Sequence, residues 1–224
     1  MITTPVRAVL FDLDGTLINS LQDIADAMNY ALTSLHMEPY PLDAYKTMVG
    51  NGAAILAKRA AQHQPHRWEE LLQAYQARYE VHKLDLSAPY AGIPEMLEAL
   101  RRRGLALAVL SNKPDQDTQG VIRHFFPDAP FSIVRGQLPH VPVKPDPTGA
   151  LAVADAMGIP PQDFLYLGDT NTDICCARNA GMRPVGVLWG FREQQELQEA
   201  GAEHIIAHPR ELLSVLDTLT EASC

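Results

Sequence analysis

Short runs of aliphatic residues alternate along most of the chain with segments that repeat apolar positions every three or four residues. Such runs are typical of strands buried in a parallel sheet, and the repeats between them are typical of amphipathic helices. Strand and helix in alternation predict an α/β fold, a doubly wound parallel sheet with helices on both faces. The expected strands are 6–11, 105–110, 131–134, 164–167 and 184–188, and the expected helices between them are 93–103, 148–157 and 172–179.

One long stretch, from about residue 21 to residue 85, carries only the helical repeat. A run of helices between the first strand and the next strand–helix unit predicts an inserted helical domain. We expect residues 1–17 and 88–224 to form the α/β core and residues 18–87 to form a helical cap. The expected helices of the cap are 21–35, 42–48, 53–62 and 68–82, divided by prolines and by the Gly-Asn-Gly turn at 50–52.

Composition and charge narrow the function classes. The 224 residues are 46% hydrophobic and 20% charged, which is an ordinary globular composition. The net charge of −9 disfavours a nucleic-acid partner, because an acidic surface repels phosphate backbones. Three cysteines make no disulfide framework, and we find neither a signal peptide nor an apolar run long enough to span a membrane. We therefore expect a cytoplasmic protein.

Two aspartates directly follow the first expected strand, in the segment Asp-Leu-Asp-Gly-Thr at 12–16. Side chains two positions apart on a strand share a face, so we expect the carboxylates of Asp12 and Asp14 to project together from its carboxyl end. Ligands of open α/β sheets bind at that edge, and Gly15 permits a sharp turn there. An acidic turn without a ligand is the alternative that these residues alone leave open.

A second acidic segment, at 168–173, follows the expected strand 164–167. Asp169 stands at the end of that strand, where a carboxylate suits a hard cation such as Mg²⁺. Asp173 falls in the first turn of the next helix, four positions later. Either support of a metal or capping of the helix would explain Asp173.

Two further polar positions also lie at a strand end or a helix start. Ser111 follows the expected strand 105–110, and its hydroxyl with the amides around Asn112 could hold a phosphoryl oxygen or begin a turn. Lys144 precedes the helix expected at 148–157. An isolated lysine is usually solvated, so Lys144 is a candidate site residue only because the other three segments accompany it.

Together the four segments resemble the motifs of the haloacid dehalogenase-like hydrolases, phosphatase branch. The acid pair at 12–14, Ser111, Lys144 and the acidic segment at 168–173 come in that family's order. The resemblance covers essentially the whole chain. It implies a Rossmann-like hydrolase core, and the helical insert is similar to the family's mobile cap.

The resemblance also implies a role for each residue. Asp12 would attack phosphorus and form an aspartyl-phosphate, while Asp14 would protonate the leaving oxygen and then activate water. Ser111, Asn112 and Lys144 would bind the phosphoryl oxygens, with Lys144 also offsetting repulsion among the carboxylates. The implied Mg²⁺ ligands are Asp12, the backbone carbonyl of Asp14, and Asp169, with Asp173 in support.

Within the family, several segments are similar to the phosphoglycolate phosphatases, although Asn19 stands where their usual pattern has an aspartate. The resemblance implies hydrolysis of a small anionic phosphoester, 2-phosphoglycolate, by a monomer or homodimer. Another small phosphoester, a pyrophosphate or a phosphosugar mutase reaction are the enzymatic alternatives. A catalytically silent phosphate-binding protein is the alternative from another class, and the presence of Asp12, Asp14 and Asp169 together disfavours it.

Specificity is expected to come from the cap, because the core motifs already account for the phosphoryl group. Gly52 begins the helix expected at 53–62, where free amides suit a carboxylate or a phosphate. Lys58 or Arg59 would add positive charge if its helix face turned inward. Trp189 and Arg192, after the last expected strand, are further candidates, whereas the aromatic residues at 68, 75 and 79 are expected to pack the cap.

Overall fold

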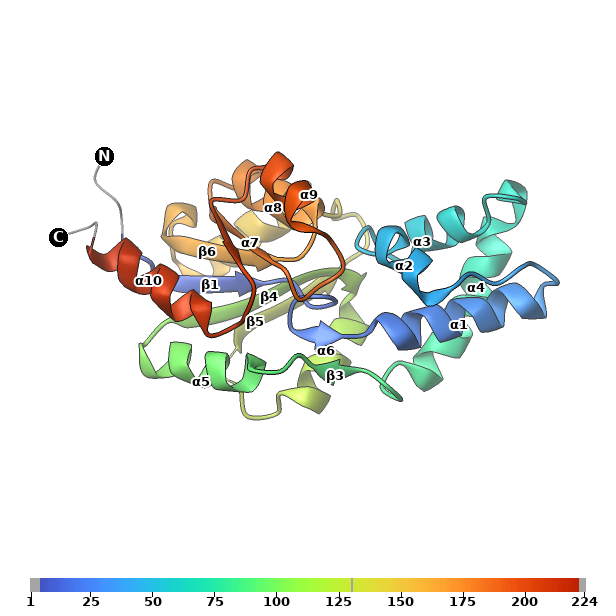
Figure 1. Ribbon diagram of the computed structural model, residues 1–224, viewed down its shortest axis with the longest axis horizontal. Helices are drawn as coiled ribbons and strands as arrows, with labels where there is room; N and C mark the ends of the chain where they lie inside the picture. The colour runs from blue at the N-terminus through green and yellow to red at the C-terminus, as the bar shows by residue number, and fades with distance from the viewer. Residues whose placement is uncertain (1–4, 130, 222–224) are drawn as a thin grey trace.

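The computed structural model describes residues 5–129 and 131–221 (Figure 1). Six parallel strands form one sheet in the order β5-β4-β1-β6-β7-β8. The chain starts at the centre, extends the sheet to one side and then to the other, which confirms the doubly wound α/β prediction. The strands are β1 (Ala8–Phe11), β4 (Ala106–Pro114), β5 (Phe131–Gln137), β6 (Phe164–Gly168), β7 (Arg183–Val187) and β8 (His204–Ile206).

The sheet has a hydrophobic core on each face. Along β1, Val9 and Phe11 pack into one cluster and Ala8 and Leu10 into the other, because successive side chains of a strand point to opposite faces. Each aliphatic side chain buried in this way stabilises the fold by about 1.5–3 kcal/mol. The helices of this part are α5 (Ile93–Arg102), α6 (Asp115–Phe125), α7 (Thr148–Met157), α8 (Asn171–Asn179), α9 (Gln194–Ala200) and α10 (Glu211–Glu221), with a short 3₁₀ turn η2 (Pro161–Asp163).

The predicted helical insert is present and is gathered at one end of the sheet (Figure 1). It has a core of its own, in which Met28, Leu32, Tyr45 and Leu71 are fully buried. Because its helices pack their apolar faces against this separate core, the sequence of the insert shows only the helical repeat. Its elements are α1 (Leu21–Ser34), α2 (Leu42–Met48), α3 (Ala53–Ala60), the 3₁₀ turn η1 (Pro65–Arg67) and α4 (Trp68–His82).

The two connections between insert and core lie side by side. They form a small antiparallel pair, β2 (Ile18–Asn19) with β3 (Ala88–Pro89), which two-residue strands give no pattern to predict. The carboxylate of Asp23 also accepts hydrogen bonds from the N–H of Leu86 and from the N–H and hydroxyl of Ser87, at 2.7–3.1 Å. The chain therefore leaves and re-enters the core at one place.

Strands β4 and β5 extend beyond their predicted ends. We expected them to end at residues 110 and 134, but β4 continues to Pro114 and β5 to Gln137, so the polar residues 111–113 lie in a strand and are buried. The expectation is wrong because Pro114 pairs with Gln137 after a shift in register, and a local pattern does not show such pairing. None of the helices in the described ranges is both long and apolar enough to cross a membrane.

Candidate active site

Asp12 lies where the two central strands end. It follows β1 directly, and its N–H donates to the carbonyl oxygen of Leu167 in β6 at 2.9 Å. Its buried carboxylate accepts a hydrogen bond from Nζ of Lys144 at 2.7 Å. Asp14 lines the same cavity as Asp12, but its carboxylate has other partners, described below. Asp12 and Asp14, the expected acid pair, therefore line one cavity, but different residues hold their carboxylates.

Asp169 is held from two sides at the end of β6. Its carboxylate accepts a hydrogen bond from the N–H of Phe191 at 2.8 Å and from the hydroxyl of Thr16 at 3.3 Å. Gly15 packs against it with φ of +92°, and a Cβ at that position would overlap the carboxylate. Only glycine therefore fits both the turn and the space beside Asp169.

Asp173 caps its helix, which is one of the two roles that its position in the sequence suggested. As the third residue of α8 it accepts hydrogen bonds from the hydroxyl and N–H of Thr170 at 2.7 and 3.2 Å, which completes a capping box. Its other carboxylate oxygen accepts from Nζ of Lys144 at 2.6 Å. Capping therefore fixes Asp173 in the orientation in which it faces the site.

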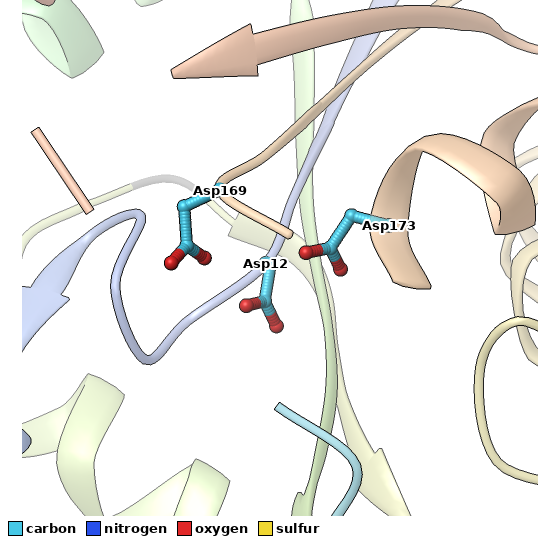
Figure 2. Close-up of side chains that lie close together, drawn as sticks. All are labelled: Asp12, Asp169 and Asp173. Atoms are coloured by element: carbon cyan, nitrogen blue, oxygen red, sulfur yellow. The ribbon is translucent and has the colours of Figure 1, made fainter. Parts of the chain in front are cut away.

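The three carboxylates converge from the ends of two strands and the start of a helix (Figure 2). One oxygen each from Asp12, Asp169 and Asp173 lies within 4.8 Å of the others, and all three residues are buried. Burial, and then repulsion by Asp173, raise the pKa of Asp12 to about 7, and the same two causes raise that of Asp169. A hard divalent cation suits this set, because it takes carboxylate oxygens and adds the positive charge that they lack.

A divalent cation is expected to stabilise the protein more at about pH 8 than at about pH 5. The folded pKa of Asp12 is about 7, above its usual 3.8. Its contribution to metal-free stability is therefore complete below the usual value and is lost as pH rises through about 7. Cation binding competes with that proton, so it strengthens over the same range. Thermal unfolding with chelator and with Mg²⁺ at both pH values measures this; equal shifts would contradict it.

Lys144 is the buried cation of the cluster. Its Nζ donates to Asp12, to Asp173 and to the carbonyl oxygen of Leu110, which uses its three hydrogens. Asn112 fixes the backbone of Lys144: its Oδ1 accepts from the Lys144 N–H at 2.9 Å and its Nδ2 donates to the Lys144 carbonyl at 3.2 Å. Nδ2 of Asn112 also donates to the carbonyl oxygen of Gly50 in the insert, at 3.0 Å. Asn112 thus ties Lys144 to the insert as well as lining the cavity.

Lys113 is a functional candidate that the sequence analysis did not select. Its Nζ donates to both carboxylate oxygens of Asp14, at 2.8 and 2.7 Å, and to the hydroxyl of Tyr79 in α4 at 2.8 Å. The hydroxyl of Ser20 donates to Oδ1 of Asp14 at 2.6 Å, and that of Ser111 accepts from the N–H of Lys113. The one feature of the sequence that could have identified Lys113 is its position, two residues after Ser111. Tyr79, expected only to pack the cap, therefore also reaches the core.

A cavity of about 260 Å³ lies between core and insert. Asp12, Asp14, Ser111, Asn112 and Lys113 form its core side. The insert supplies Gly52 and Ala53 at the start of α3, together with apolar and aromatic side chains. The core motifs and the insert therefore line one partly open cavity, which suits a small molecule.

The cations expected on the insert have other positions. Nζ of Lys58 lies 4.4 Å from the ring centre of Trp68, and Arg59 donates to the carbonyl oxygen of Met48 at 2.7 Å. Neither residue lines the cavity. Arg192 donates to the carbonyl oxygen of Val49 at 3.0 Å, whereas Nε1 of Trp189 donates to the carbonyl oxygen of Thr16 at 2.9 Å. Both of these residues hold the chain around the site rather than line it.

Comparisons with known proteins agree with this geometry. Residues 9–187 match the family model described as haloacid dehalogenase-like hydrolase. Relatives called phosphoglycolate phosphatase are 31% identical in Pseudomonas fluorescens, over 96% of this chain and 82% of theirs, and 32% identical in Pasteurella multocida, over 96% and 100%. A solved structure from Lactobacillus delbrueckii subsp. bulgaricus superposes with a TM-score of 0.91 at 26% identity, over 95% of this chain and 99% of that one. The chain belongs to the haloacid dehalogenase-like hydrolases.

Proposed function

We propose that the protein is a Mg²⁺-dependent phosphomonoesterase that hydrolyses 2-phosphoglycolate to glycolate and phosphate through an aspartyl-phosphate on Asp12. The observation that carries the proposal is the buried group of Asp12, Asp169, Asp173 and Lys144, from which Asp12 lines the cavity between core and insert. Two relatives at 31% and 32% identity that are called phosphoglycolate phosphatase support the substrate.

Asp12 is the proposed nucleophile. Its carboxylate oxygen attacks phosphorus, the bond from phosphorus to the ester oxygen breaks, and the phosphoryl group is held on Asp12 until water attacks it. Lys144 contacts the same carboxylate at 2.7 Å and offsets the charge that phosphoryl oxygens bring. Ser111, which lines the cavity beside Asp12, donates its hydroxyl hydrogen to a phosphoryl oxygen.

Asp14 is the proposed acid and base. Its carboxyl group, in the protonated form, donates its proton to the leaving oxygen, and the resulting carboxylate then accepts a proton from the attacking water. Ser20 and Lys113 hold this carboxylate in the cavity at 2.6–2.8 Å, so its position is set before a substrate arrives. Pre-set geometry of this kind lowers the entropic cost of reaching the transition state.

The residues that would hold Mg²⁺ are Asp12, the backbone carbonyl of Asp14, and Asp169, with Asp173 in support. When bound, the cation would neutralise charge on the phosphoryl group and on the carboxylates around it. Burial, and then repulsion by Asp173, raise the pKa values of Asp12 and Asp169, and a bound cation would offset both effects.

We further propose that residues 18–87 act as a cap that closes over the substrate, with residues 1–17 and 88–224 as the catalytic core. Among the hydrogen bonds that cross between the parts, three involve the turn at 49–51: Asn112 donates to the Gly50 carbonyl at 3.0 Å, Asn51 to the Thr172 hydroxyl at 3.1 Å, and Arg192 to the Val49 carbonyl at 3.0 Å. Each joins the 49–51 turn to a core residue next to the site. Closure there would exclude water from the reacting group.

The test is a panel of small phosphomonoesters and pyrophosphate, compared by kcat/KM with Mg²⁺ and with chelator. The proposal expects hydrolysis only with Mg²⁺ and the highest kcat/KM for 2-phosphoglycolate. A higher value for another member of the panel would replace the substrate but keep the reaction. Absence of hydrolysis across the panel would refute the proposed function and favour a phosphate-binding protein.

Gly52→Val is expected to harm turnover of 2-phosphoglycolate more than that of p-nitrophenyl phosphate. Gly52 has φ of +85°, lines the cavity, and would place a Cβ 3.2 Å from the carbonyl oxygen of Asn112. If an amide at the start of α3 binds the carboxylate of 2-phosphoglycolate, the loss in kcat/KM for this substrate exceeds the loss for p-nitrophenyl phosphate by about 10- to 150-fold. Gly104→Val is the control, because Gly104 also has positive φ but has no neighbour within 4 Å. Equal losses on both substrates would assign the turn to cap closure alone.

A further inference from the structure

The cavity has one cationic side chain in its lining, within the ranges that the structure describes. That side chain is Lys113, and the lining also contains the carboxylates of Asp12, Asp14, Glu80 and Asp117. Glu80 and Asp117 both pair with Lys83. Lys113 is buried, so water screens its charge little. An anionic group on the substrate, apart from the phosphoryl group, therefore has Lys113 as its cationic partner.

The ammonium group of Lys113 has three hydrogens, and all three are engaged. Two go to the two oxygens of the same carboxylate, that of Asp14, and the third goes to the hydroxyl of Tyr79. Two hydrogen bonds to one carboxylate are partly redundant. One of them can be exchanged for a bond to a substrate anion while the ion pair with Asp14 remains.

The two oxygens of Asp14 are not equivalent. Oδ1 accepts from the Ser20 hydroxyl as well as from Lys113, at 2.6 and 2.8 Å. Oδ2 accepts from Lys113 at 2.7 Å. When the bond from Lys113 to Oδ2 is exchanged, Ser20 and Lys113 still hold Asp14 through Oδ1. Oδ2 is then free to take up a proton from solvent and donate it to the leaving oxygen of the substrate.

We propose that Lys113 binds a carboxylate of the substrate and, by doing so, releases Oδ2 of Asp14 toward the ester oxygen. The inference rests on the proposed function and names the substrate class: phosphomonoesters whose carboxylate is attached to the ester carbon. The spacing follows from the contact between Lys113 and Asp14 at 2.7–2.8 Å. A single carbon separates the carboxylate of 2-phosphoglycolate from its ester oxygen, and this short spacing matches two side chains that are in direct contact. Amides at the start of α3 can bind the other carboxylate oxygen.

The experiment compares substrates that differ only in the anionic group. Each enzyme is assayed with 2-phosphoglycolate, with ethyl phosphate, which has a methyl in place of the carboxylate, and with 3-phosphooxypropanoate, which has one more methylene. The measured quantity is the kcat/KM for each acid divided by that for ethyl phosphate. Such a ratio is independent of the fraction of active enzyme, so partial misfolding of a variant does not change it.

In the unmodified protein the ratio is expected to be high for 2-phosphoglycolate and much lower for the longer acid. Lys113→Met is expected to lower the 2-phosphoglycolate ratio about 10- to 150-fold, the range for a charge-assisted hydrogen bond. Lys58→Met is the matched control, because Lys58 is exposed and lies against Trp68 outside the cavity. That variant should leave the ratio unchanged.

A second measurement covers the case in which Lys113→Met turns over neither substrate. Dissociation constants for 3-phosphonopropanoate and propylphosphonate, in which a methylene replaces the ester oxygen, are measured by calorimetry on the same proteins. The preference for 3-phosphonopropanoate should fall by the same factor in Lys113→Met. An unchanged preference in either measurement would overturn the inference while leaving the phosphatase intact. Absence of any phosphoester hydrolysis by the unmodified protein would instead refute the proposed function.

Discussion

Asp12→Asn is expected to abolish turnover, with a loss in kcat of about 10⁴-fold or more. The amide is not a nucleophile, yet it has nearly the same shape and its oxygen still accepts a hydrogen bond from Lys144. The substitution also removes one of three crowded carboxylates. The fold should therefore survive, with an unfolding midpoint in chelator at least as high as that of the unmodified protein. Hydrolysis of p-nitrophenyl phosphate with saturating Mg²⁺ measures the loss.

Asp155→Asn is the control for Asp12→Asn, because it makes the same chemical change on the exposed side of α7. It should leave kcat unchanged. Substantial activity of Asp12→Asn, with asparagine verified at that position by mass spectrometry, would contradict a covalent mechanism through Asp12.

Asp169→Asn is expected to raise the Mg²⁺ concentration needed for half-maximal activity at least about 10-fold and to lower the maximal rate about 100-fold. One anionic ligand is lost, while the amide oxygen still accepts from the N–H of Phe191, which limits structural change. Activity is titrated with Mg²⁺, and the increase in unfolding midpoint on adding Mg²⁺ is measured in parallel. Ca²⁺ should inhibit both proteins, because its longer and looser coordination spoils the in-line geometry.

Undiminished activity of Asp169→Asn, or activity of the unmodified protein in excess chelator, would show that the acidic cluster is not a required metal site. Asp155→Asn again serves as control, and its dependence on Mg²⁺ should match that of the unmodified protein.

The sequence predicted the fold and the position of the acidic cluster because both depend on local patterns. Alternating buried runs and helical repeats identify parallel strands, and parallel strands end at one edge. Polar residues placed directly after such runs must meet at that edge, as Asp12 and Asp169 do. The stop signals were equally local, so α2, α4 and α7 begin and end at the predicted residues.

The parts that the sequence did not predict depend on contacts between distant segments. Lys113 meets Asp14 across 99 positions and Tyr79 across 34, and no spacing rule connects them. The extension of β4 to Pro114 depends on the pairing of Pro114 with Gln137 in β5 after a shift in register. For Lys58 and Arg59 the helix itself was predicted, but the direction of each side chain is set by Trp68 and by the Met48 carbonyl.

The reaction of Asp14→Asn with p-nitrophenyl phosphate and Mg²⁺ is the most direct test of the aspartyl-phosphate on Asp12. The good leaving group needs no proton, so Asp12 can still be phosphorylated, whereas the attacking water lacks its base. We predict a burst of p-nitrophenolate equal to the enzyme concentration, with one phosphoryl group per chain, located on Asp12 by borohydride reduction and peptide mass spectrometry. Continued turnover in which Asp12 is unmodified throughout would contradict it.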